Sequence, residues 1–363
     1  MKKTVLILFV LLLSSLLARD KIFVVERENS ALAVIDHNLF KNEIKNMHNF
    51  NHAVVKFRGK DGYVITRDGY VIKFDPIKEV KEKEYKTSKS AIGFIIGKNF
   101  LAVANYDNKT VEILSRDLEP LQSIKTGSRN VGIKLYKDYL IFECMDSDQI
   151  WVMKNDNPKG KKPHFVLYKK FVDVGQVPFD ALIDKNLYVS GFFNSPFLGV
   201  LNLDTMKYKT IPLDLGKKDR ILKVPHFGFW SVSKGYFFIP AVGAKKVFVF
   251  THDFKLVKEI NVVGNPVFTS LSPNKKYLAV TFSGKDFPKV QIIDTKTLKV
   301  IKNFKFKGMV LHVRWSSDGR HLYISVNGAN QVLAYNVNGW WKHFMWPIPK
   351  PSGIFIYKMK DDK

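Results

Sequence analysis

Cysteine is nearly absent from this sequence, since Cys144 is the only one in 363 residues. A single thiol excludes an internal disulfide, and it excludes zinc ribbons and Cys-x-x-Cys-His haem attachment, which need at least two cysteines. The sequence also lacks H-E-x-x-H, G-x-S-x-G, P-loop, dinucleotide-binding and EF-hand motifs. It therefore gives no support for classical hydrolase chemistry or for a nucleotide cofactor.

Acidic residues are scarce relative to basic ones. The chain carries 33 Asp and Glu against 58 Lys and Arg, a formal net charge of +25 at pH 7. Its 49 lysines are spread along the chain instead of clustering, which is not typical of a nucleic-acid groove. Two interpretations stay open: a lysine-rich solvated surface of the kind seen in thermophiles, or a field that attracts an anionic ligand or partner.

Long hydrophobic runs are absent apart from the N-terminus. Two lysines precede an apolar stretch from Val5 to Leu17, which is followed by a small residue. This layout is typical of a secretory signal, and 13 residues are short for a membrane span. We expect a signal peptide over 1–18, export to the periplasm, and one mature domain over 19–363. An uncleaved membrane anchor is the alternative, and the lack of a following cysteine excludes a lipid anchor.

The rest of the sequence predicts strands. Short runs of Val, Ile, Phe and Tyr alternate with polar residues between Gly, Asn, Asp and Pro. Eight such runs end in a polar turn, at Asp36, Asp75, Arg116, Asn155, Asp204, His252, Asp294 and Asn336. Their mean interval of about 43 residues is the length of one four-stranded propeller blade. We expect an all-β fold, one eight-bladed β-propeller, closed by pairing of the N- and C-terminal strands in one blade.

A second series of runs, in phase with the first, marks the innermost strand of each blade. Inner strands of a propeller line the axial channel and start at one face, so the residues at their starts gather around one opening. These residues are His52, Ser90, Arg129, Pro178, His226, Phe268, His312 and Ser352. A histidine at a strand start is usually a turn or capping residue, but three of the nine histidines on one ring favour a binding site.

Several segments, taken in order, resemble one family. NHAVVKFRGKDGYVITRDGYVIKFD (51–75) is followed by SRNVGIKLYKDYLIFECMDSDQIWV, KVPHFGFW, VLHVRW and PSGIF. This order resembles the NirF family of haem d1 biosynthesis proteins and, more distantly, the haem d1 domain of cytochrome cd1 nitrite reductase. Each segment alone is unspecific, but their collinearity from about residue 21 to 356 is specific. The chain departs from these families in having lysines at many arginine positions and no attached c-type haem domain.

The resemblance implies a propeller that holds a d1-type tetrapyrrole, an iron macrocycle with several carboxylates, at its mouth. His52 matches the histidine that binds the iron in the nitrite reductase, and His226 matches a second histidine suited to proton transfer, so these two are the expected catalytic residues. Arg67 and Arg129 match basic positions that would pair with ring carboxylates. His312, in VLHVRW, would support cofactor binding.

Three functions are compatible with these residues. The first is a periplasmic enzyme of late haem d1 maturation that oxidises or modifies a side chain of haem d1 or its dihydro-haem d1 precursor. The second is a non-catalytic scaffold that binds and delivers the precursor. The third is a generic YVTN-type interaction propeller, which would give no reason for the ring of histidines. Expected partners are other haem d1 maturation proteins, a c-type cytochrome or nitrite reductase, and no nucleic acid.

Overall fold

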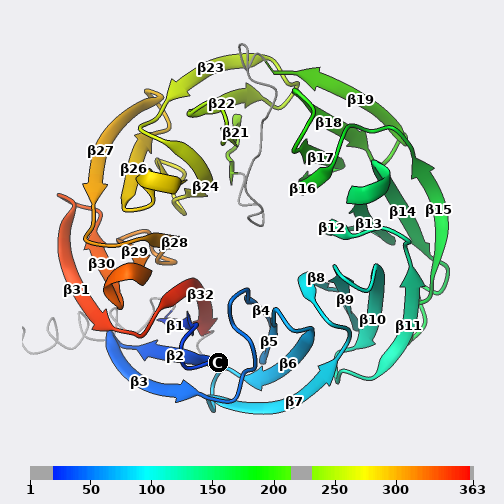
Figure 1. Cartoon of the computed structure of the whole chain (residues 1–363), viewed down its shortest axis with the longest axis horizontal. Coiled ribbons are helices and arrows are strands. Elements are labelled where there is room, and N and C mark those ends of the chain that lie inside the picture. The colour runs from blue at the N-terminus through cyan, green and yellow to red at the C-terminus, as the bar shows by residue number, and fades with distance from the viewer. Residues whose placement is uncertain (1–18, 214–230, 360–363) are drawn as a thin grey trace, which may run out of the picture.

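The computed structural model describes residues 19–213 and 231–359. In this part of the chain, eight four-stranded antiparallel sheets are arranged as blades in a ring (Figure 1). The eight-bladed β-propeller predicted from the sequence is therefore confirmed. The signal segment expected over 1–18 and the expected site residue His226 lie outside the described residues.

Each blade is named here by its place in the chain, with its strands given from the axis outward. Blade 1 is β32 (Pro351–Met359), β1 (Arg19–Glu26), β2 (Ala31–Asp36) and β3 (Leu39–Ile44). Blade 2 is β4 (Val54–Arg58), β5 (Asp61–Ile65), β6 (Tyr70–Asp75) and β7 (Val80–Lys86). Blade 3 is β8 (Ala91–Ile96), β9 (Phe100–Asn105), β10 (Thr110–Ser115) and β11 (Pro120–Lys125). Blade 4 is β12 (Asn130–Tyr136), β13 (Tyr139–Cys144), β14 (Gln149–Asn155) and β15 (Phe165–Phe171).

The second half of the ring repeats this order. Blade 5 is β16 (Pro178–Asp184), β17 (Leu187–Phe192), β18 (Phe197–Asn202) and β19 (Lys207–Pro212). Blade 6 is β20 (Ser231–Val232), β21 (Tyr236–Ala241), β22 (Lys246–Thr251) and β23 (Leu256–Asn261). Blade 7 is β24 (Asn265–Leu271), β25 (Tyr277–Ser283), β26 (Lys289–Asp294) and β27 (Lys299–Lys305). Blade 8 is β28 (Val310–Trp315), β29 (His321–Val326), β30 (Gln331–Asn336) and β31 (Trp341–Pro347).

Helical structure in the described residues is limited to single 3-10 turns. These turns are η2 (Met145–Ser147), η3 (Gly284–Asp286) and η4 (Asn327–Ala329). Each follows the second strand of its blade, in blades 4, 7 and 8. In an antiparallel blade that turn lies at the face where the inner strand begins, so the three turns border the same face as the candidate site. No helix in the part of the chain that the structure describes is long and apolar enough to span a membrane.

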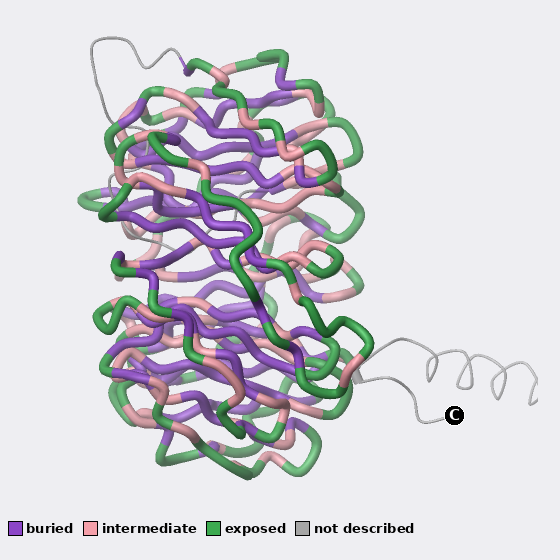
Figure 2. Tube along the Cα trace, turned by 90° about the vertical axis from the view of Figure 1, so that its right-hand side faces the viewer, coloured by how far each residue is buried: buried purple, intermediate pink, exposed green. Residues whose placement is uncertain are grey.

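The hydrophobic core lies between blades. Along β9, Leu101 and Val103 pack toward blade 2, whereas Ala102 and Ala104 pack toward blade 4. This alternation follows from the two-residue repeat of a strand, and both faces are buried because a blade is covered on each side. Figure 2 shows the buried middle strands in purple and the exposed turns and outer strands in green. The stacked blades hold the inner strands in fixed positions around the axis.

The ring closes where the two ends of the described chain meet. β32 pairs with β1 in antiparallel register, with Ile22 opposite Ile356 and Phe23 opposite Phe355. The C-terminal strand thereby takes the innermost place in blade 1. This pairing removes two free edges, which would otherwise present unpaired backbone groups.

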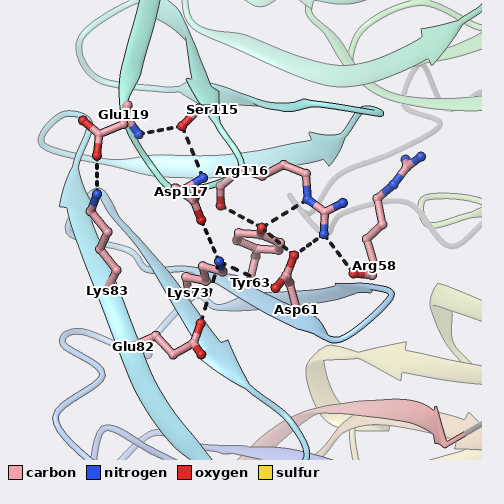
Figure 3. Close-up of polar contacts among 10 residues, drawn as sticks. All are labelled: Arg58, Asp61, Tyr63, Lys73, Glu82, Lys83, Ser115, Arg116, Asp117 and Glu119. Atoms are coloured by element: carbon pink, nitrogen blue, oxygen red, sulfur yellow. Dashed lines mark hydrogen bonds and ion pairs between the residues drawn. The ribbon is translucent and has the colours of Figure 1, made fainter. Parts of the chain in front are cut away.

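Polar contacts join blades 2 and 3 at the face opposite the inner-strand starts (Figure 3). The guanidinium of Arg116 pairs with Asp61 and donates to the carbonyl oxygen of Arg58 at 3.1 Å. Lys73 Nζ lies 2.8 Å from Asp117 Oδ1 and 3.6 Å from Asp61 Oδ1. These groups come from the first turn and strand β6 of blade 2 and from the outer turn of blade 3, so the network connects the two blades.

Candidate functional site

A pocket opens where several inner strands begin. Its cavity volume is about 100 Å³, and it is open to solvent at its mouth. Four members of the ring expected from the sequence line it: His52, Phe268, His312 and Ser352. They come from blades 2, 7, 8 and 1, so propeller closure brings together residues that are up to 300 positions apart in sequence.

His52 precedes β4 and is partly buried at the pocket wall. Its Nε2 lies 3.1 Å from the carbonyl oxygen of Ile92, on the inner strand of blade 3. A carbonyl only accepts, so Nε2 carries the hydrogen and donates it. In the neutral ring Nδ1 then carries the lone pair. The nitrogen with the lone pair is the one through which an imidazole binds a metal.

His312 is buried on β28 and is held in one tautomer. The backbone N–H of Ile354 donates to its Nδ1 at 3.1 Å, so the neutral ring carries its hydrogen on Nε2. Its ring stacks on Phe355, with centroids 5.9 Å apart, and meets the edge of Phe268 at 6.2 Å. Burial, with the nearby charge of Arg314, lowers the pKa of His312 well below its usual value. At neutral pH it is therefore a fixed, uncharged group.

Arg27 is a pocket residue that the sequence reasoning missed. It follows β1 at the same face, and its side chain lines the pocket beside His52. Burial lowers the pKa of its guanidinium. Its Nε is buried and has no hydrogen-bond partner within residues 19–213 and 231–359. A buried donor of this kind suits an acceptor on a ligand. Its place directly after the first strand was the available signal, but the repeat pattern predicts only the residues at inner-strand starts to lie around the opening.

Arg129 lies outside this pocket and is bound to an acid. Its Nε donates to Asp146 Oδ1 at 2.7 Å, and its backbone N–H donates to Asp146 Oδ2 at 2.8 Å. Its Nη1 donates to the hydroxyl of Tyr106 at 3.0 Å. The hydrogen bond to Asp146 raises the pKa of Arg129 above its usual value. The sequence analysis did not identify Asp146, which η2 places opposite the start of β12.

Arg67 lies in the turn between β5 and β6, at the face of the pocket but not in its lining. Its Nη1 donates to the hydroxyl of Ser90 at 3.3 Å, and its backbone N–H donates to the carbonyl oxygen of Asn49 at 3.0 Å. The structure therefore gathers His52 and His312 in one pocket, and it places Arg67 on blade 2 and Arg129 at the start of blade 4, both at the same face but outside the pocket lining.

These features define an eight-bladed β-propeller with an imidazole-bearing and guanidinium-bearing pocket at its axial mouth. Residues 18–360 match the model of the cytochrome D1 heme domain family, and the chain belongs to this family. Protein NirF of Pseudomonas aeruginosa is 29% identical to it over 356 residues, covering 92% of this chain and 90% of that protein. Protein NirF of Stutzerimonas stutzeri is 26% identical with the same coverage. The predicted resemblance to NirF is confirmed.

Solved structures share the fold. The dihydro-heme d1 dehydrogenase NirN, solved in complex with DHE, superposes with a TM-score of 0.80 at 20% identity, covering 92% of this chain and 74% of that one. Apo AztD of Citrobacter koseri superposes with a TM-score of 0.68 at 11% identity, covering 94% and 98%. At these identities the likeness concerns the arrangement of blades.

Proposed function

We propose that this protein binds a haem d1-type tetrapyrrole at the propeller mouth and takes part in the late steps of haem d1 assembly. The observation that carries the proposal is the pocket in which His52, His312 and Arg27 meet, in a chain of the cytochrome D1 heme domain family. The similarity to two NirF proteins, and the fold shared with a dehydrogenase named for dihydro-heme d1, support the same ligand class.

The residues of the pocket fit such a ligand. Phe268 and Phe355 provide apolar walls for a flat macrocycle, and the guanidinium of Arg27 is suited to a peripheral carboxylate. His52 is the proposed iron ligand. Binding through Nδ1 would preserve the hydrogen bond from Nε2 to Ile92, and that bond would hold the ring plane, as second-shell contacts do for metal-bound histidines. Arg67 and Arg129 would meet further carboxylates at the rim.

Proton transfer is assigned to His226 in this proposal. His312 stays neutral at physiological pH, so it can donate a hydrogen bond through Nε2 but is a poor general acid. We propose side-chain oxidation or modification of the precursor as the reaction, in the periplasm after export directed by residues 1–18. Delivery to nitrite reductase without chemistry is the alternative, with maturation proteins or a c-type cytochrome as partners.

The test is an anaerobic titration with dihydro-haem d1, followed through the Soret and red absorption bands. We expect saturable binding by the wild-type protein, and a shifted spectrum with weaker binding for His52→Ala. His164→Ala is the matched control, because His164 is exposed on the outer side of blade 4. An unchanged spectrum and affinity in His52→Ala would remove His52 from the iron. Conversion of the bound precursor upon addition of an electron acceptor would separate an enzyme from a scaffold.

A further inference from the structure

A second cavity lies deeper along the axis. Its volume is about 120 Å³, and it is lined by residues of the inner strands β4, β8, β12 and β16. Val54 lines both this cavity and the pocket at the mouth. Two lysines, Lys56 and Lys134, belong to its wall, although they come from blades 2 and 4. The sequence analysis did not distinguish them from the other lysines.

Lys56 has a confined amine. Its Nζ donates to the carbonyl oxygen of Phe94 and lies 5.0 Å from the centre of the Phe94 ring. Burial and, to a lesser degree, the charge of Lys134 lower its pKa to about 7. Within the described chain, no acidic group is among the causes of that shift. An ammonium has three donors, and among residues 19–213 and 231–359 the one hydrogen bond of this group goes to the Phe94 carbonyl, which leaves hydrogen-bonding capacity unused there.

The acids near Lys134 do not balance the two lysines. Burial lowers the pKa of Lys134, and Asp180 and Glu143 oppose that effect. Asp180 also lines the cavity and accepts a hydrogen bond from the backbone N–H of Ala181 at 2.8 Å. Burial raises the pKa of Glu143 to about 8, so it is mainly uncharged at pH 7. Among the described residues that line the cavity, the two amines therefore share it with one carboxyl group, that of Asp180.

We propose that this cavity is an anion site that binds a carboxylate between Lys56 and Lys134. Two amines that line one partly dehydrated cavity are suited to bind an oxyanion. Its oxygen atoms accept hydrogen bonds from both amines and so replace the water molecules that an exposed amine would contact. The site stands independently of the proposed function. The carboxylate can come from a side arm of a ligand at the mouth, since Lys56 is two residues beyond Val54, or about 7 Å along the strand. It can equally come from a free small acid.

Binding at this site takes up a proton. A bound carboxylate favours the charged form of Lys56, whose amine is only partly protonated at pH 7 in the free protein. Of the charged groups around the cavity, Lys134 acts on Lys56, and Asp180 and Glu143 act on Lys134. Glu143 ionises near pH 8 and then adds a repelling negative charge. Both effects act in one direction, so carboxylate affinity falls as the pH rises from 6 to 9.

Calorimetric titration of the exported protein with sodium acetate at constant ionic strength tests the proposal. We expect Lys56→Met and Lys134→Met each to weaken acetate binding at least tenfold, the lower limit for loss of a charged hydrogen bond. Lys60→Met is the matched control, because Lys60 is exposed at the turn after β4. We expect the fold to be kept, because methionine replaces a partly buried lysine with an apolar side chain of similar length, and thermal unfolding of each variant tests this.

The wild-type affinity should fall roughly tenfold or more between pH 6.5 and 8.5, and this dependence should be much weaker in Lys56→Met. Equal acetate affinity in Lys56→Met and Lys60→Met would overturn the proposal, as would an absence of acetate binding to wild type. Titration with dihydro-haem d1 then identifies the source of the carboxylate that binds between Lys56 and Lys134. Competition between acetate and the tetrapyrrole indicates a ligand side arm, and simultaneous binding indicates a free acid. Tetrapyrrole binding without any acetate site would refute this inference and leave the proposed function intact.

Discussion

Replacing Glu143 with glutamine should remove a pH-dependent loss of stability. Glu143 lies on β13 and is fully buried, with the hydroxyl groups of Ser190 and Tyr188 beside its carboxyl group. Burial raises its pKa from 4.5 to about 8, an effect that Asp180 increases and that Ser190 and Lys134 oppose. The folded protein therefore holds this side chain as a neutral acid at pH 7, where the unfolded chain would ionise it.

The sign and size of the effect follow from this difference. Between pH 4.5 and 8 the folded state binds one more proton than the unfolded state, so stability falls as the pH rises. Each pH unit in this range lowers the free energy of unfolding by about 1.4 kcal/mol. The decrease is therefore about 3 kcal/mol at pH 7, and it levels off near 5 kcal/mol above pH 8. Glutamine has the same shape and no charge to desolvate, so the variant carries none of this loss.

Urea unfolding from pH 5 to pH 9 measures the effect. The stability of Glu143→Gln should rise relative to wild type by about 4 kcal/mol across this range. Glu28→Gln is the control, since Glu28 is exposed and should leave the difference constant. Parallel curves for wild type and Glu143→Gln would show that Glu143 is ionised in the folded protein. The excess of positive charge in the deeper cavity would then be smaller than described.

Four further outcomes follow from the structure. Arg116→Met should lower the free energy of unfolding, measured in urea, by about 1 kcal/mol and by less in high salt, because it removes a partly exposed ion pair between blades. An effect that does not depend on salt would contradict this. Gly132→Ala should lower the free energy of unfolding by more than about 2 kcal/mol, since Gly132 has a φ of 61° and a Cβ there would lie 2.8 Å from Glu143 Oε2. A urea midpoint equal to that of the wild type would refute the close packing. Arg27→Met should weaken tetrapyrrole binding by about 1.5 to 3 kcal/mol, whereas Lys209→Met, at an exposed position, should leave it unchanged. Equal losses in the two variants would indicate that the net positive charge of the protein, and not Arg27 in particular, attracts the ligand. Sequencing of the mature protein should find a start near Arg19 in the periplasmic fraction, and a full-length protein in the membrane fraction would favour an anchor.

The fold and the position of the site could be predicted from the sequence because each blade of a propeller repeats the same pattern of strands and turns. Alternating runs at a mean interval of about 43 residues specify blades, and closure of the ring converts residues before inner strands into neighbours. This reasoning placed His52 and His312 together without any contact information. It also gave the C-terminal strand its partner, because blade 1 lacked an inner strand of its own.

Side-chain partnerships could not be predicted in the same way. Asp146 pairs with Arg129 only because η2 follows β13 and turns its carboxylate toward the start of β12. Arg27 lies at the mouth because blade 1 draws its strands from both chain ends, which breaks the repeat at that position. Lys56 and Lys134 share a cavity because β4 and β12 project them at similar depth. In sequence they are two among 49 lysines.

The seam between β1 and β32 also sets the order of events in folding. Its partners are separated by more than 300 positions, so this contact has one of the largest loop-closure costs in the molecule. The strand that completes blade 1 follows every other strand of the ring in the chain, so the ring cannot close before β32 has been synthesised. Until then β1 exposes a backbone edge that can pair with another chain. Fast delivery of the whole polypeptide, or a chaperone that covers this edge, therefore governs the yield of correctly closed rings.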